Sequence, residues 1–142
     1  MFEIGRRLRS KAIYDHKSIV VIYLGDHDPS GIDMTRDVED RLSMYSETNS
    51  IVVERIALNY PQIALWNPPE NPAKTTDSRF ASYEAKFGQS SWELDAVEPA
   101  TLARLITDTV NQYRDMNAWN DAIARETKMR QTLQEFADTY HE

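Results

Sequence analysis

Two apolar runs separated by a helical pattern dominate the first half of the chain. The runs are residues 18–25 (SIVVIYLG) and 50–58 (SIVVERIAL), and both are rich in β-branched side chains. Such runs are typical of strands covered on both faces in a parallel sheet. The segment between them places apolar residues at helical spacing: Met34, Val38, Leu42 and Tyr45. Strand, helix and strand in this order predict a βαβ unit with parallel, neighbouring strands.

Three further helical patterns lie outside this unit. Residues 3–14 place apolar side chains four apart on one face, and two helices are predicted at 99–115 and 118–140. The last helix has a long apolar stripe made of Trp119, Ile123, Met129, Leu133, Phe136 and Tyr140. This stripe fits either a core-facing side or a surface for a protein partner, and we favour the core.

The middle of the chain has a different character. Residues 59–79 include four of the six prolines and predict a long, mostly irregular loop with one turn of helix around 62–65. Long loops of this kind are usually functional or disordered. A short helix at 78–87 should end at Gly88, and 91–97 (SWELDAV) is consistent with a short edge strand. The predicted fold is therefore α/β, a single domain over 1–142 with a Rossmann-like parallel sheet flanked by helices and two C-terminal helices.

Composition and charge restrict the function. The chain has 142 residues, no cysteine and a net charge of −7, which argues against indiscriminate binding of polyanions. No apolar run approaches the ~20 residues of a membrane span, and no secretory signal opens the chain, so we expect a cytoplasmic protein without a membrane partner. The segment 6–11 (RRLRSK) is locally basic. Arg6, Arg7 and Arg9 therefore form either a phosphate-contacting patch or one solvated helix face.

A pair of aspartates follows the first apolar run in the segment 23–34 (YLGDHDPSGIDM). Residues two apart in an extended segment point the same way, so Asp26 and Asp28 can direct both carboxylates to one point. Such oxygen ligands suit Mg²⁺, which prefers one or two carboxylates together with substrate phosphate. Ser30 is a plausible N-cap of the next helix, and the amides at Ser30 and Gly31 would face a phosphate. We expect His27 to face solvent or pack rather than ligate metal.

The segment around this pair resembles the Asp-x-Asp turn of Toprim domains, which topoisomerases, primases and some nucleases share. The D-x-D-P-x-G form is most similar to the topoisomerase VI A subunit and Spo11 branch and to phage-type proteins. The resemblance extends over roughly residues 5–110 and includes 55–63 (RIALNYPQI) and 91–97. It implies that Asp26 and Asp28 bind Mg²⁺ or Mn²⁺, and that the substrate is nucleic acid, with DNA favoured.

The resemblance also implies a glutamate at the end of an earlier strand, and no such strand precedes residue 18. The chain thus resembles a Toprim domain that lacks its first βα unit, either as a fragment or as a reduced form, and a protein partner or a missing N-terminal segment could complete it. Glu93 and Asp95 repeat the two-apart spacing and could replace that glutamate, or they could lie on a solvent-facing edge. Lys74 and Arg79 could contact phosphate or be isolated surface cations.

Two functions follow from this reading. The first is a magnesium-dependent domain for DNA cleavage, strand passage or nuclease activity, weak or inactive as this chain alone. The second is a non-catalytic module that binds metal, nucleic acid or a protein partner. For either function, the adjacent charges of Asp26 and Asp28 should be destabilising without metal. Replacing one with Asn should leave the melting temperature unchanged or raise it, while weakening divalent-ion binding.

Overall fold

The computed structural model describes residues 2–14, 16, 18–46 and 51–140. Within it the chain forms two compact units, Met1–Leu102 and Ala103–Glu142. The first unit contains the strands and the candidate site, and the second unit is helical.

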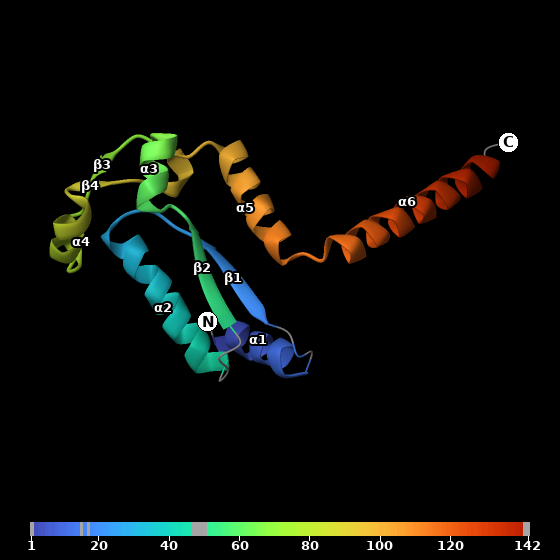
Figure 1. Ribbon diagram of the computed structural model, residues 1–142, viewed down its shortest axis with the longest axis horizontal. Helices are drawn as coiled ribbons and strands as arrows, with labels where there is room; N and C mark the ends of the chain where they lie inside the picture. The colour runs from blue at the N-terminus through green and yellow to red at the C-terminus, as the bar shows by residue number, and fades with distance from the viewer. Residues whose placement is uncertain (1, 15, 17, 47–50, 141–142) are drawn as a thin grey trace. The chain divides into compact units, whose positions relative to one another are not determined.

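The first unit is built on the expected βαβ arrangement. Strand β1 (Ile19–Leu24), helix α2 (Pro29–Ser46) and strand β2 (Ile51–Ala57) follow one another, and the two strands pair in parallel (Figure 1). The register aligns Ile19 with Ile51 and shifts once, between Tyr23 and Leu24. The backbone pairing continues past β1, because the amide of Leu58 donates to the carbonyl of Gly25 at 2.7 Å. The predicted parallel pairing is confirmed.

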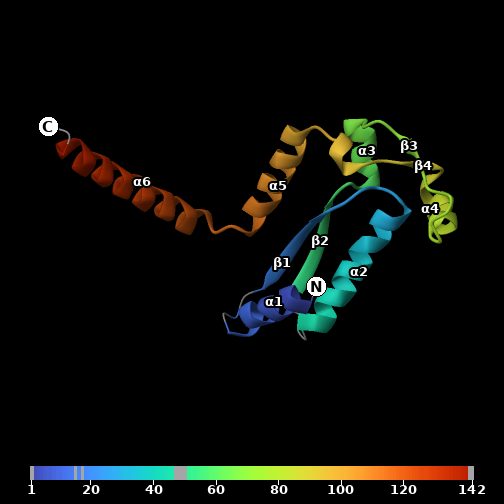
Figure 2. The ribbon, with the colours of Figure 1, turned by 180° about the vertical axis from the view of Figure 1, so that it is seen from behind.

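Helix α1 (Phe2–Tyr14) packs against α2 near the end of the unit where β1 begins. Gly5 is buried at this contact, and the rings of Phe2 and Tyr45 meet edge to face with centroids 5.7 Å apart. Both ribbon views place α1 beside the C-terminal end of α2, whereas the β1–α2 turn lies at the opposite end (Figures 1 and 2). The basic helix and the acidic turn thus occupy opposite ends of the βαβ unit.

Sheet burial is lower than the apolar runs predict. Every residue of β1 is only half-buried, and Val52 in β2 is 57% exposed. The described part of the chain shows a small two-stranded parallel sheet packed against helices, and α1 and α2 also pack against each other. The expectation of strands covered on both faces is therefore wrong for these residues, since a pair of strands lacks the neighbours that would close the second face.

The segment predicted as a mostly irregular loop contains short regular elements, including a helix at the predicted helical turn around 62–65. Helix α3 (Tyr60–Trp66) opens with a reciprocal capping box between Asn59 and Gln62. Strand β3 (Asn71–Pro72) pairs antiparallel with β4 (Ser90–Ser91), and helix α4 (Phe80–Phe87) ends at Gly88 as expected. The 3₁₀ helix η1 (Leu94–Ala96) follows β4.

An aromatic cluster joins these elements to the end of β1. His27 is 1% exposed, and its ring contacts Tyr60, Tyr83, Phe87 and Trp92 with centroids 4.7–5.8 Å apart. His27 Nδ1 lies 2.8 Å from the Tyr83 hydroxyl. Burial lowers the pKa of His27 below its usual value. Of the two expected roles of His27, packing and solvent exposure, the structure shows packing.

Helices α5 (Pro99–Tyr113) and α6 (Met116–Thr139) close the chain as predicted. Asp115 caps α6 by accepting hydrogen bonds from the amides of Asn117 and Ala118. The apolar stripe of α6 is exposed along its whole length, from 43% at Trp119 to 74% at Tyr140. Within the second unit, therefore, this stripe is not covered by a core. Among the described helices, none is both long and apolar enough to span a membrane.

Candidate metal and phosphate site

The turn between β1 and α2 holds both aspartates in half-buried positions at the carboxyl end of the strand. Asp26 Oδ1 accepts a hydrogen bond from the amide of Leu94 at 2.8 Å. Asp28 Oδ1 accepts one from the amide of Gly31 at 2.5 Å. Each carboxylate thus has one oxygen in a structural hydrogen bond, and its Oδ2 has no hydrogen-bond partner among the described residues.

Asp28, rather than Ser30, is the cap of α2. The helix begins at Pro29, one residue after Asp28, and the Asp28 carboxylate accepts from the third helical amide. Proline favours this start because its fixed φ suits the first helical position and it has no amide hydrogen to satisfy. The Ser30 hydroxyl instead donates to Asp77 at 2.8 Å. The predicted Ser30 cap is wrong, and the Gly31 amide expected to face a phosphate is occupied by Asp28.

Gly31 is required by a close approach at this turn. A Cβ atom at position 31 would overlap the carbonyl oxygen of Asp26 and lie 3.0 Å from Asp28 Oδ1. Because the overlapping atom belongs to the backbone, a larger side chain could not be accommodated by a rotamer change. Gly31 therefore brings the start of α2 against the acidic turn.

Glu93 lies in the electrostatic field of the acidic pair. Its pKa is raised, first because the negative charge of Asp26 is nearby and also because of burial and the charges of Asp95 and Asp28. Lys74 acts in the opposite direction, which places its positive charge near the same carboxylate. The hydrogen bond from the amide of Leu94 to Asp26 places the neighbouring Glu93 beside this aspartate, and the charge of Lys74 acts on the Glu93 carboxylate.

The segment containing Glu93 is not a regular edge strand. Strand β4 ends at Ser91, Trp92 makes one isolated bridge to His27, and Leu94–Ala96 forms η1. The argument that Glu93 and Asp95 point the same way because they are two apart in a strand is therefore wrong. The amide of Leu94, the first residue of the 3₁₀ helix, donates a hydrogen bond to Asp26. Glu93 and Asp95 are both exposed, and Trp92 is packed inward as the edge reading expected.

Arg55 of β2 holds the acidic turn in place through hydrogen bonds to its backbone. The sequence analysis did not identify this residue. Its guanidinium donates to four backbone carbonyls at 2.7–3.1 Å, those of Gly25, Asp26, Gly31 and Leu58. It also donates to the Thr35 hydroxyl at 3.0 Å. Burial lowers the pKa of Arg55, and Tyr23, Asp26 and Asp28 partly offset that effect. Its position within an apolar strand sequence could have pointed to this role, because a cation removed from water needs hydrogen-bond partners nearby.

Arg79 lies near the start of α2 but is already paired. Its Nε donates to Asp33 Oδ2 at 2.8 Å, and its Nη1 lies 3.5 Å from Asp77 Oδ1. These carboxylates raise the pKa of Arg79, with the hydrogen bond to Asp33 as the largest cause. A phosphate at this position would have to compete with two carboxylates for the guanidinium.

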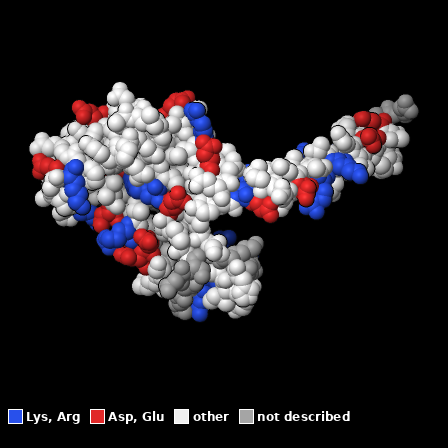
Figure 3. Space-filling model, viewed as in Figure 1, with Lys and Arg blue, Asp and Glu red and all other residues white. Residues whose placement is uncertain are grey.

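The structure does not bring the arginines of α1 to the acidic pair. Arg6 forms an exposed ion pair with Glu3 at 3.0 Å, and Arg7 and Arg9 are exposed on the same helix. At a rise of about 1.5 Å per residue, α2 spans about 24 Å from its start to Tyr45, which contacts α1. On the face shown in Figure 3, acidic and basic side chains are interspersed without a broad basic surface.

The donor chemistry of the turn fits a hard divalent cation in part. The Oδ2 atoms of Asp26 and Asp28 are the kind of oxygen ligand that Mg²⁺ and Mn²⁺ accept, with water and phosphate completing the shell. Within residues 2–14, 16, 18–46 and 51–140, however, no group of three or more His, Cys, Asp or Glu side chains is arranged to hold a metal. The fit therefore rests on two aspartates, with Glu93 beside them.

Compared with models of protein families, with curated proteins and with solved structures, the chain has no match in any of the three.

Proposed function

We propose that this chain is a Toprim-type domain that binds Mg²⁺ or Mn²⁺ through Asp26 and Asp28 and acts on nucleic-acid phosphodiesters, with DNA as the favoured substrate. The observation that supports it most is the hydrogen bond from the amide of Leu94 to Asp26 Oδ1 at 2.8 Å, which brings the preceding residue, Glu93, beside the aspartate, in agreement with the raised pKa of the Glu93 carboxyl group. Three carboxylates at the carboxyl end of a parallel strand repel one another unless a cation or a proton is bound between them.

The chain's own residues have separable tasks in this proposal. Asp26 and Asp28 would hold the cation, which when bound would polarise a phosphate and orient the attacking group. Glu93, with its raised pKa, is suited to hold or release a proton next to that phosphate. Lys74 would offset negative charge there, and Arg55 would keep the turn in place through its carbonyl contacts.

A non-catalytic binding module is the second candidate function. It is favoured by the absence of a three-ligand group among the described residues and by the structural hydrogen bonds of both aspartates. Such a module would bind a divalent ion or a nucleic acid without cleaving it.

The test is calorimetric titration of Mg²⁺ and Mn²⁺ into the chain and into an Asp26→Asn, Asp28→Asn variant. An Asp37→Asn, Asp40→Asn variant is the matched control, because it removes two charges from the exposed side of α2. We expect divalent binding to be lost only in the first variant. Binding that is absent from the unmodified chain, or equal in both variants, would contradict the proposal.

Cleavage is measured separately by nicking of supercoiled plasmid with Mn²⁺. Activity that Glu93→Gln abolishes would support the enzyme. Metal binding without nicking would favour the module.

A further inference from the structure

A pocket of about 490 Å³ opens on the first unit, away from the residues of the acidic turn. It is lined by helix α3, by the loop that follows it and by Trp92. Its volume lies within the ~300–1,000 Å³ typical of small-molecule sites. The long proline-rich segment identified in the sequence supplies most of its wall. This segment therefore forms a pocket that is separate from the residues of the acidic site.

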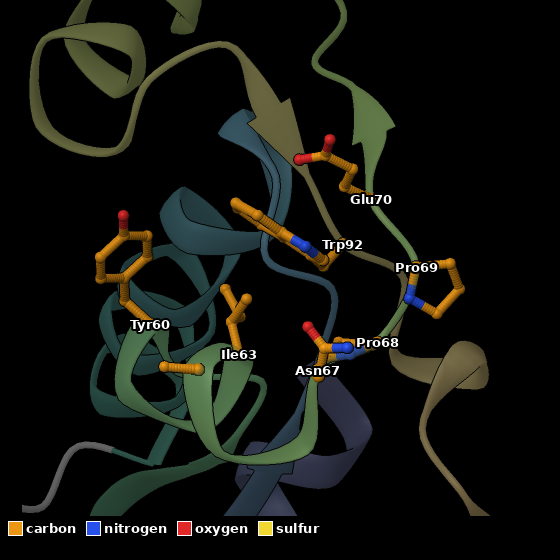
Figure 4. Close-up of a pocket in the computed structure, with 8 residues that line it drawn as sticks. Tyr60, Ile63, Asn67, Pro68, Pro69, Glu70 and Trp92 are labelled. Atoms are coloured by element: carbon orange, nitrogen blue, oxygen red, sulfur yellow. The ribbon is translucent and has the colours of Figure 1, made fainter.

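The pocket has a fixed aromatic floor. In Figure 4, Trp92 lies in the middle of the labelled side chains, with Tyr60 and Ile63 on one side and Pro69 on the other. Trp92 is held by a pair of backbone hydrogen bonds with His27, at 2.8 and 3.0 Å. Its ring also packs edge to face on the rings of His27 and Tyr60. Trp92 itself is only 9% exposed, so a planar ligand would touch the accessible edge of this ring and stack on the ring of Tyr60, which is 48% exposed.

Two polar side chains line the same pocket. In Figure 4 the amide of Asn67 points toward Trp92, and the carboxylate of Glu70 lies on the other side of that ring in this view; both residues are exposed. Asn67 is the C-cap of α3 in the left-handed conformation (φ 46°), and its backbone amide donates to Ile63. Neither side chain has a hydrogen-bond partner among the described residues. An amide offers both a donor and an acceptor, and a carboxylate offers acceptors only.

We propose that this pocket binds a nucleobase with an exocyclic amino group, adenine best, from a single-stranded segment of nucleic acid. An asparagine amide pairs with the adenine amino group and ring nitrogen, a carboxylate accepts from an exocyclic amine, and aromatic side chains stack unpaired bases. An aromatic side chain from a protein would cover the floor but leave Asn67 and Glu70 unpaired. The choice of nucleic acid as partner rests on the proposed function.

The pocket and the acidic pair would contact different nucleotides. The ring of His27 packs among aromatic side chains, whereas the carboxylates of Asp26 and Asp28 accept hydrogen bonds from the amides of Leu94 and Gly31. Trp92 packs on the His27 side, whereas Glu93, the next residue, lies near Asp26. A base on Trp92 therefore belongs to a neighbour of the nucleotide whose phosphate reaches the aspartates.

The experiment is fluorescence anisotropy with two labelled single-stranded dodecamers in low salt. One contains only thymine, and the other has four central adenines. Asn67→Gly removes the amide but keeps the left-handed conformation, which glycine adopts readily. Leu65→Ala is the control, because Leu65 is 76% exposed on the same helix and does not line the pocket. Both variants are checked for unchanged melting temperature.

We expect the adenine-containing strand to bind more tightly, and Asn67→Gly to weaken it about tenfold while Leu65→Ala leaves it unchanged. Measurements with EDTA, and with Asp26→Asn, Asp28→Asn, separate this site from the metal. The adenine preference should survive both, even if the proposed metal-dependent function fails. Equal binding of the two strands, or an Asn67→Gly variant that binds both as the unmodified chain does, would overturn the pocket assignment.

Discussion

At the scale of single residues, the acidic turn shows how one side chain can serve fold and function together. Asp28 caps α2 through Oδ1, and Asp26 Oδ1 accepts from the amide of Leu94, so the Oδ2 of each has no hydrogen-bond partner among the described residues. Carboxylates that would only repel each other are thereby given structural hydrogen bonds. The expected neutrality of Asp→Asn replacements still stands, because an asparagine oxygen can accept the same bonds.

The two roles of Asp28 can be separated by substitution. Asp28→Ala should lower the free energy of unfolding by about 1 kcal/mol, because the helix loses its cap. Asp28→Asn should be nearly neutral, since asparagine caps as well as aspartate. Both should lose divalent binding. Urea unfolding with and without Mg²⁺ measures this, and equal stability of the Ala and Asn variants would show that the cap contributes nothing.

Arg55 should be among the most sensitive positions of the first unit. Arg55→Gln removes donors from four buried or half-buried carbonyls, so we expect a loss of about 3 kcal/mol in the free energy of unfolding. Arg41→Gln is the control, because Arg41 is exposed and forms an ion pair with Asp37 on the surface of α2, and it should change stability by less than about 0.5 kcal/mol. Similar effects of the two substitutions in denaturant unfolding would contradict this role.

Glu93 should titrate above the usual glutamate range. A raised pKa means that the folded chain holds the proton more tightly than the unfolded chain. Its contribution to folding is therefore complete below the ordinary glutamate pKa and is lost as pH rises through the raised value. Carboxyl NMR should show that the pKa of Glu93 falls in Asp26→Asn and also when Mg²⁺ is added to the unmodified chain. If the pKa of Glu93 stays the same in both experiments, Glu93 does not interact with the acidic site.

At the scale of elements, the packing of α1 on α2 depends on a residue without a side chain. A Cβ atom at Gly5 would lie 2.5 Å from Cβ of Tyr45. The helices can approach this closely only because position 5 is glycine, and this contact places α1 at the far end of the unit from the acidic turn.

Gly5→Ala should therefore destabilise the chain even though alanine favours helix by about 1 kcal/mol over glycine. We expect a net loss of about 1–3 kcal/mol, as in other overpacked contacts. Ser10→Ala, at an exposed position of the same helix, should be neutral or stabilising. Thermal unfolding of the two variants gives the comparison, and a stabilised Gly5→Ala chain would mean that the helices separate without cost.

At the scale of the whole molecule, charge and exposure set how the chain can meet partners. The net charge of −7 is distributed without a broad basic surface on the face shown in Figure 3. A polyanion would therefore depend on local contacts and on any bound cation rather than on a general attraction. The apolar stripe of α6 is the other feature of this scale, because its large side chains are exposed within the described chain.

Replacing exposed residues of this stripe should hardly change stability. Met129 and Leu133 are each 67% exposed, so a Met129→Gln, Leu133→Gln variant should unfold within about 0.5 kcal/mol of the unmodified chain. Denaturant unfolding measures this at several protein concentrations. A large, concentration-dependent loss would show instead that the stripe is buried in solution against another chain.

The sequence by itself determined the βαβ unit, the end of α4 at Gly88 and the two C-terminal helices. These elements follow from local periodicity, β-branched runs and capping residues, which act within a few positions of the chain. It also predicts that the side chains of Asp26 and Asp28 point the same way, because residues two apart in an extended segment share a side.

Only the tertiary structure decided which distant residues meet that pair. Arg55 reaches the turn from a neighbouring strand, Glu93 approaches because Leu94 bonds to Asp26, and the arginines of α1 are kept away by the length of α2. It also decided that the stripe of α6 is exposed, and it assembled the pocket over Trp92. Long-range contacts depend on how whole elements pack, and no local pattern in the sequence encodes the neighbour that a side chain will find across the fold.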